Sequence, residues 1–263
     1  MIRKPIAAGY FYSENSGQLA DFIDAHKYTG ELSDAMVIIS PHAGYIYSGA
    51  VSVKTLSKAK LTDTVIILGV NHTGFGEPVA LWDKGLWETP FGNVEIDEEV
   101  AADIIKATSA VSDVVAHVRE HSIEVIVPIL KYLKPNIKIV PIVISGMNMS
   151  KITAFANDLS YFMGNNGCSV IVSSDMNHYE NKEITDTKDF LAIEQILKVD
   201  GEALYDTVMD KSVSMCGVYP ATAALIAAKK AGASRGELVE HTTSGEVSGD
   251  FDSVVGYAGI IIK

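Results

Sequence analysis

The feature that most constrains this chain is a set of three apolar runs, each followed within a few residues by a histidine. Short continuous apolar runs are typical of strands buried on both faces, and helical patterns separate them here. This alternation predicts an α/β fold, a sheet with helices on both faces. Ligands in such sheets bind beyond the carboxyl ends of the strands, so the histidines are expected to converge in one pocket. The runs are 36–40, 64–70 and 168–173, and the histidines are His42, His72 and His178.

The other elements are predicted from periodicity and turn residues. Residues 80–96 combine Gly, Pro and alternating apolar positions, which favours a hairpin. Ser16 and Asp97 are the expected N-caps of two helices. Pro141 predicts an edge position or a bulge for its strand, because proline removes a ladder donor. The expected helices are 17–26, 48–59, 97–107, 150–163, 185–198, 200–210 and 219–230, and the further strands are 137–144 and 252–262. No linker or repeat interrupts the order, so residues 1–263 are interpreted as one domain.

Composition excludes several classes of function. The net charge is −12 and no Lys/Arg cluster is longer than a pair, so a nucleic-acid partner is not expected. No segment approaches the roughly 18–20 apolar residues of a membrane span, and the N-terminus does not continue into a signal-peptide core. Two cysteines in dissimilar contexts favour free thiols in a reducing compartment. We therefore expect a cytoplasmic protein that does not associate with membranes.

Three side chains stand out as candidate metal ligands. His42 and His72 each follow a predicted strand within a glycine-containing turn, although a histidine in such a turn equally suits capping a backbone carbonyl. Cys216 precedes a predicted helix, where a thiol gains thiolate character and suits a nucleophile or a soft metal ligand. The alternative for Cys216 is a small buried apolar residue. Imidazole and thiolate together suit Fe(II), Cu or Zn and disfavour Mg and Ca.

Two further clusters could move protons. Asp175 and His178 are three residues apart, a spacing that suits a proton relay or a ligand with its orienting partner. The alternative is a helix cap at Asp175 with an exposed histidine. Glu120, His121 and Glu124 could sit together at a helix start, either behind the ligands or only as a solvated first turn.

At this point the chain resembles a known family. The ordered motifs are Lys4-Pro-x-Ala-x-Gly9, Pro41-His-Ala-Gly-Tyr-x-Tyr-Ser-Gly49, Asn71-His72, Thr89-Pro-Phe-Gly92, Glu120-His-Ser-Ile-Glu124, Ser174-Asp175-x-x-His178 and Cys216-Gly217. They occur in the order seen in Memo proteins and cover nearly the whole chain. Memo proteins are similar in fold to class III extradiol ring-cleaving dioxygenases, which implies a mixed, largely parallel sheet.

The resemblance also implies the roles of site residues. It implies His42, His72 and Cys216 as metal ligands, with Fe(II) the first candidate and Cu or Zn as alternatives. Asp175, His178 and His121 would line the same pocket as catalytic groups. The dioxygenases use two histidines and one carboxylate, so a cysteine at the third position departs from their pattern.

The resemblance extends to ligands and partners. Eukaryotic Memo proteins resemble phosphotyrosine-peptide binders, and their Gly-x-Trp-Tyr-Pro segment corresponds here to Gly9-Tyr-Phe-Tyr-Ser13. Prokaryotic relatives are linked with a radical-SAM protein, which implies an association with that pathway. The residues expected to contact a small-molecule or peptide ligand are Phe11, Tyr12, Tyr45, Tyr47 and Asn71.

Three functions follow as hypotheses. The first is a metal-dependent, dioxygenase-like redox enzyme that acts on a small molecule. The second is a non-catalytic peptide- or protein-binding module with a vestigial pocket. The third is hydrolysis by a metal-bound water.

Overall fold

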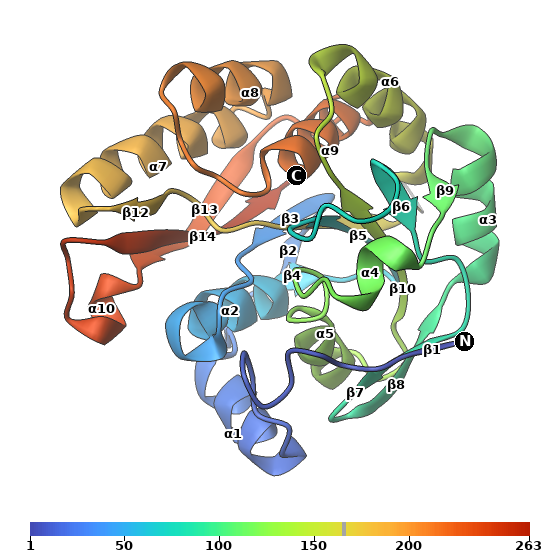
Figure 1. The fold of residues 1–263 in the computed structure, drawn as a ribbon, viewed down its shortest axis with the longest axis horizontal. Coiled ribbons are helices and arrows are strands. Elements are labelled where there is room, and N and C mark those ends of the chain that lie inside the picture. Colours follow the sequence, from blue (N-terminus) through green and yellow to red (C-terminus); the bar gives the residue numbers. More distant parts are fainter. Residues whose placement is uncertain (165–166) are drawn as a thin grey trace.

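A computed structural model describes residues 1–164 and 167–263. One large mixed sheet runs through the molecule, in the order β1-β7-β8-β10-β5-β11-β3-β14-β12 (Figure 1). Strand β13 pairs with β14, β6 pairs with β10 and β9, and β2 with β4 forms a separate small sheet. The strands are β1 Ile2–Arg3, β2 Ser33–Asp34, β3 Val37–Ser40, β4 Ala59–Lys60, β5 Thr64–Val70, β6 Val79–Leu81, β7 Leu86–Thr89, β8 Gly92–Ile96, β9 Val111–Ser112, β10 Lys138–Ile144, β11 Ser169–Ser173, β12 His178–Glu180, β13 Gly236–Thr243 and β14 Val254–Ile262.

Helices cover both faces of this sheet. Figure 1 shows α6, α8 and α9 on one side of the strands and α1, α2 and α5 on the other. Helix α9 packs on β3, β5 and β11, and α2 packs on β3 and β14. The helices are α1 Ser16–His26, α2 Ala50–Lys58, α3 Glu98–Ala107, α4 Val115–Val118, α5 Val127–Leu133, α6 Met149–Leu159, α7 Lys182–Leu197, α8 Gly201–Asp210, α9 Val218–Lys230 and α10 Gly245–Ser248, with a π-helical turn η1 Tyr45–Gly49 and a 3₁₀ turn η2 Ser160–Phe162. The predicted α/β class with a largely parallel core is confirmed.

The three apolar runs form adjacent strands at the centre of the sheet. Strand β11 pairs in parallel with β5 on one side and with β3 on the other. These strands are almost completely buried, which explains their continuous apolar sequence. Their carboxyl ends therefore lie side by side, as the sequence predicted.

The prediction of an edge position or a bulge at Pro141 was wrong, because β10 has partners on both sides and its register with β5 does not shift. Strand β10 pairs with β5 along its whole length, while on its other side β8 pairs only as far as Ile139 and β6 only from Ile142. The carbonyl of Pro141 accepts a hydrogen bond from the Trp82 backbone N–H at 3.1 Å on the β6 side. The nitrogen of a strand residue points to the same side as its carbonyl. The missing N–H of Pro141 therefore lies on the side where β8 has ended and β6 begins, so neither strand loses a hydrogen bond of its ladder.

Smaller corrections concern element ends. Asn15 caps α1 in place of Ser16, because its side chain accepts the Gln18 N–H at 3.0 Å. Asp97 caps α3 as predicted. The helix expected at 48–59 starts earlier, as the π-helical turn that precedes α2, and β13 was not predicted. In the part of the chain that the structure describes, no helix is both long and apolar enough to cross a membrane.

Candidate metal centre

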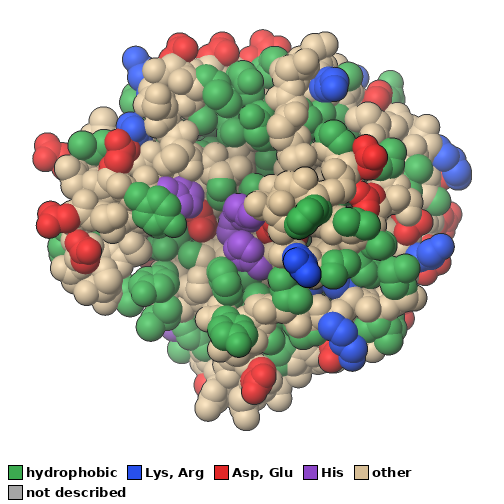
Figure 2. All heavy atoms as spheres, viewed as in Figure 1, with side chains coloured by type: hydrophobic (Ala, Val, Ile, Leu, Met, Phe, Trp, Pro, Cys, Tyr) green, Lys and Arg blue, Asp and Glu red, His purple; other side chains and the backbone are tan. Residues whose placement is uncertain are grey.

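A cavity of about 570 Å³ opens at the carboxyl ends of β3, β5 and β11. Figure 2 shows histidine side chains gathered in a hollow on this face of the molecule. Segments from distant parts of the sequence meet here because the strands that precede them are neighbours in the sheet. The cavity is lined by Phe11, His42, Ala43, Gly44, His72, His121, Asp175, His178, Tyr179, Ser214, Cys216, Val255 and Tyr257.

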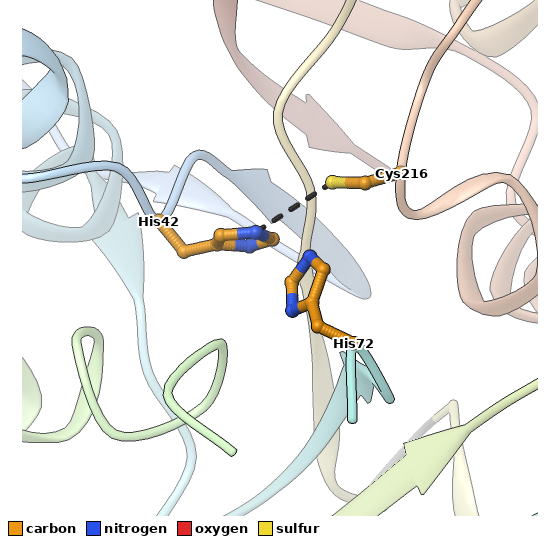
Figure 3. Close-up of side chains that lie close together, drawn as sticks. All are labelled: His42, His72 and Cys216. Atoms are coloured by element: carbon orange, nitrogen blue, oxygen red, sulfur yellow. Dashed lines mark hydrogen bonds between the residues drawn. The ribbon is translucent and has the colours of Figure 1, made fainter. Parts of the chain in front are cut away.

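Three of these residues could hold a metal ion. One ligand atom from each of His42, His72 and Cys216 lies within 4.8 Å of the other two. The Sγ of Cys216 is 3.6 Å from the Nε2 of His42. Figure 3 shows both imidazole rings and the thiol pointing toward one another. Two nitrogens and one sulfur in this arrangement suit Fe, Cu or Zn, and leave coordination positions on the cavity side.

Hydrogen bonds fix which nitrogen of His42 is available. The Nδ1 of His42 lies 2.7 Å from the Oγ of Ser173. This hydroxyl donates its own hydrogen to the carbonyl of Ser122 at 2.6 Å, so it accepts from Nδ1–H. The Nε2 lone pair is therefore left to face Cys216. Burial lowers the pKa of His42 to about 4, which keeps the ring neutral, as metal ligation requires.

Glu120 orients His72 in the same way. Its carboxylate accepts the His72 Nδ1–H at 2.9 Å and the His72 backbone N–H at 2.6 Å. It also accepts the backbone N–H groups of His121 and Ser122, each at 2.8 Å. Burial opposes ionisation, but the His72 hydrogen bond and these donors lower the pKa of Glu120 to about 2. An ionised acceptor behind a metal-binding histidine fixes the ring and makes its Nε2 a stronger ligand.

Cys216 lies in a tight backbone setting. Its Sγ accepts the Asp175 backbone N–H at 3.2 Å. A Cβ on Gly217 would lie 2.3 Å from the Cβ of Ser174, so only glycine allows this approach. Burial and the nearby Asp175 charge raise the pKa of the Cys216 thiol well above its usual value. The expected thiolate character at the start of α9 was therefore wrong for the metal-free protein, and a bound cation would have to displace the proton.

Asp175 and His178 lie against the same cavity. Asp175 is buried, and its Oδ1 accepts the His42 backbone N–H at 2.8 Å, which ties together two of the strand-end loops. The Nδ1 of His178 donates to the Ser214 carbonyl at 2.9 Å. Because a carbonyl can only accept, Nδ1 carries the hydrogen, and in the neutral ring the lone pair lies on Nε2, where it suits a proton acceptor.

His121 forms the wall beside His72. Their rings stack with centroids 4.9 Å apart, and Phe11 contacts His121 at 4.5 Å between centroids. Burial lowers the pKa of His121, which favours its neutral form. A second group of potential ligands comprises His72, Glu120 and His121, but Glu120 already accepts four hydrogen bonds there.

Of the five expected ligand contacts, the structure brings only Phe11 to the cavity wall. Tyr12 and Tyr45 are buried, and their hydroxyls donate to Glu124 at 3.0 Å and to the Val125 carbonyl at 2.7 Å. Both rings pack in the core and are not exposed to the cavity. Tyr47 is partly exposed outside the cavity lining. The Asn71 side chain closes its own turn by donating to the Phe75 carbonyl at 2.7 Å.

Sequence reasoning missed three lining residues that carry a hydroxyl group, Tyr179, Ser214 and Tyr257. Tyr179 directly follows His178, a predicted site residue, and this adjacency was the signal that could have identified it. Ser214 lies two residues before Cys216 in the same loop. Tyr257 reaches the cavity from β14, which pairs with β12, and no local sequence pattern reveals that pairing.

The fold and the site define a class of protein: a mixed α/β protein with a largely parallel sheet and a candidate two-histidine, one-cysteine metal centre. A family model described as "Memo-like protein" matches residues 3–261, so the chain belongs to the Memo family. A MEMO1 family protein of Sulfurisphaera tokodaii is 42% identical, over 99% of both chains. Relatives from Saccharolobus solfataricus and Desulfurococcus amylolyticus, also named MEMO1 family proteins, are 41% and 38% identical over 98% of both chains.

Proposed function

We propose that this protein is a metal-dependent oxidoreductase that acts on a small molecule in the cavity. His42, His72 and Cys216 would hold the metal, with Fe(II) as the first candidate and Cu or Zn as alternatives. The observation that carries the proposal is the pair of Nδ1 hydrogen bonds, which orient both imidazole rings beside one thiol. Burial opposes protonation of His72 but Glu120 raises its pKa, so a metal bound there would displace a proton. When bound, such a metal would supply a Lewis-acidic and, for iron or copper, redox-active centre.

The surrounding side chains would manage protons and orientation. His178 would accept a proton at Nε2, because its Nδ1–H is held by the Ser214 carbonyl. Asp175 would keep the His42 loop in place through its backbone hydrogen bond. His121, neutral and stacked on His72, would offer a second proton-transfer group on the opposite side of the ligand pair.

Metal analysis tests this proposal. The protein is purified without oxygen, loaded with Fe(II) or Zn, and freed of excess metal by gel filtration. We expect stoichiometric metal in the wild type, loss in Cys216→Ser, and retention in Cys168→Ser, which removes the cysteine that lies outside the cavity. Equal metal content in the two serine variants would contradict the proposed ligand set.

The binding-module alternative has a weaker structural basis. Exposed apolar side chains beside the His42 loop, Ile46 at 70% and Tyr47 at 40%, favour contact with a partner. Tyr12 and Tyr45 cannot contribute to it because they are buried. A partner captured from native extract by wild type and equally by His42→Ala would support this alternative. A radical-SAM partner, a cytoplasmic location and metal-assisted hydrolysis stay predictions.

A further inference from the structure

The cavity that contains the candidate metal centre offers no cationic side chain to a ligand. Its lining residues include neither Lys nor Arg among the residues that the structure describes. Asp175 contributes a carboxylate, and Glu120 lies directly behind His72. With the Cys216 thiolate, the two carboxylates would bring three negative charges to the site. A bound divalent metal would leave a net charge of −1, so the loaded site would still disfavour anions. The whole chain has the same bias, with a net charge of −12.

Three aromatic side chains also line the cavity. Phe11 comes from the N-terminal segment, Tyr179 from β12 and Tyr257 from β14. Tyr257 is 2% exposed, and burial raises its pKa, so its hydroxyl stays uncharged. Aromatic faces attract flat apolar groups and, through their quadrupole, cationic ones.

Tyr179 is the extra residue of a bulge in β12, where the register against β14 shifts between His178 and Glu180. Its φ is +61°, in the left-handed region that a bulky residue rarely adopts. Its side chain is 77% exposed, so burial of the ring does not compensate the strain. Strained residues of this kind are concentrated at ligand-contacting sites, where the surrounding structure holds them in place.

Both neighbours of Tyr179 are held firmly. The backbone N–H of His178 donates to the Ser214 Oγ at 2.7 Å. On the other side, the Glu180 carboxylate accepts from the Asn177 side chain at 2.7 Å and pairs with Lys188 at 2.7 Å. These contacts fix the residues on both sides of the bulge at Tyr179.

We propose that the cavity takes a flat, non-anionic small molecule bearing an amine or hydroxyl donor, and that Tyr179 is its specificity-determining residue. The flat part would pack on the aromatic side chains, and the donor group would face the lone pair on the Nε2 of His178. This inference deepens the proposed function because it names the ligand class of the same cavity. Its test can also be carried out on metal-free protein, so the two proposals fail separately.

The test compares matched probes by NMR titration of metal-free and zinc-loaded protein, observed at the histidine ring signals. Benzylamine and benzyl alcohol represent the expected class, phenyl phosphate and benzoate are the anions, and cyclohexylmethylamine is the non-flat amine. We expect benzylamine and benzyl alcohol to bind about tenfold tighter than either anion and than cyclohexylmethylamine.

Two variants test whether the Tyr179 ring is responsible for the binding preference. Tyr179→Ala should weaken benzylamine binding about tenfold, whereas Tyr161→Ala, which removes a tyrosine of similar exposure outside the cavity, should leave it unchanged. Tyr179→Gly should also lose binding while its melting temperature stays equal or rises, because glycine adopts this φ without strain.

Three results would overturn the inference: anions that bind as tightly as the amine, no binding by any probe up to its solubility limit, or Tyr179→Ala that binds like the wild type. Failure of zinc to load, with the probe preferences intact in metal-free protein, would instead reject the proposed metal centre alone.

Discussion

Acidification from pH 7 to pH 4 should destabilise the folded protein by about 3 kcal/mol through one buried imidazole, that of His117. This side chain is 1% exposed and lies against the rings of Trp82 and Trp87. Its Nε2–H donates to the Ala80 carbonyl at 3.0 Å. Its Nδ1 is buried without a hydrogen-bond partner among the described residues. A proton added there would create an uncompensated buried charge close to Arg3.

The magnitude follows from the pKa of His117. Burial lowers it from 6.5 to about 4, aided by the Arg3 charge. Between these two pH values the unfolded chain binds a proton at this histidine that the folded protein does not. Stability is therefore complete above pH 6.5 and falls as the pH drops toward 4. At about 1.36 kcal/mol per pKa unit, the interval corresponds to roughly 3 kcal/mol.

Urea denaturation at several pH values measures this effect. His117→Gln removes the titrating group, so its loss of stability between pH 7 and pH 4 should be about 3 kcal/mol smaller than that of the wild type. The comparison holds even if the variant is less stable at pH 7. His26→Gln, which removes a half-buried histidine at the end of α1, serves as the matched control. Parallel curves for wild type and His117→Gln would refute the reasoning.

Two further predictions concern the site and its support. Glu120→Gln should weaken zinc binding about 10–100-fold in competition with a chelator, because the imidazole ligand loses its anionic acceptor; Glu31→Gln, at an exposed loop, should not. Gly256→Ala should lower the free energy of unfolding by roughly 2–3 kcal/mol, since its Cβ would lie 1.8 Å from a buried Asp189 oxygen. Gly146→Ala, where a Cβ meets nothing within 4 Å, is the control, and equal loss in both alanine variants would contradict this account.

The central part of the fold was predictable because its signal is local. Strands β3, β5 and β11 are buried on both faces, so each is a continuous apolar run, and parallel order places their carboxyl ends together. The convergence of His42 and His72 follows from that order alone. The position of Pro141 was not predictable, because the sequence does not show that β6 and β8 divide one side of β10 between them.

The rest of the site depends on long-range contacts that leave no local pattern. Tyr257 lines the cavity only because β14 pairs with both β3 and β12. The exclusion of Tyr12 from the cavity depends on Glu124, more than 100 residues away, which accepts its hydroxyl. Aromatic residues in a motif therefore indicate that a segment is packed, but not which face of it meets a ligand.

The contacts of Glu124 and Arg3 connect the N-terminal segment to the turn that contains Glu120. Its carboxylate accepts the Tyr12 hydroxyl, two backbone N–H groups of the N-terminal segment, and the Arg3 guanidinium at 2.6 Å. Arg3 also donates to the backbone carbonyl of Glu120, the residue that orients His72. The segment that brings Phe11 to the cavity is thus fixed to the turn that orients the candidate ligand His72. Because this ion pair is buried, removal of either partner would leave an uncompensated charge and loosen the aromatic wall and the ligand support together.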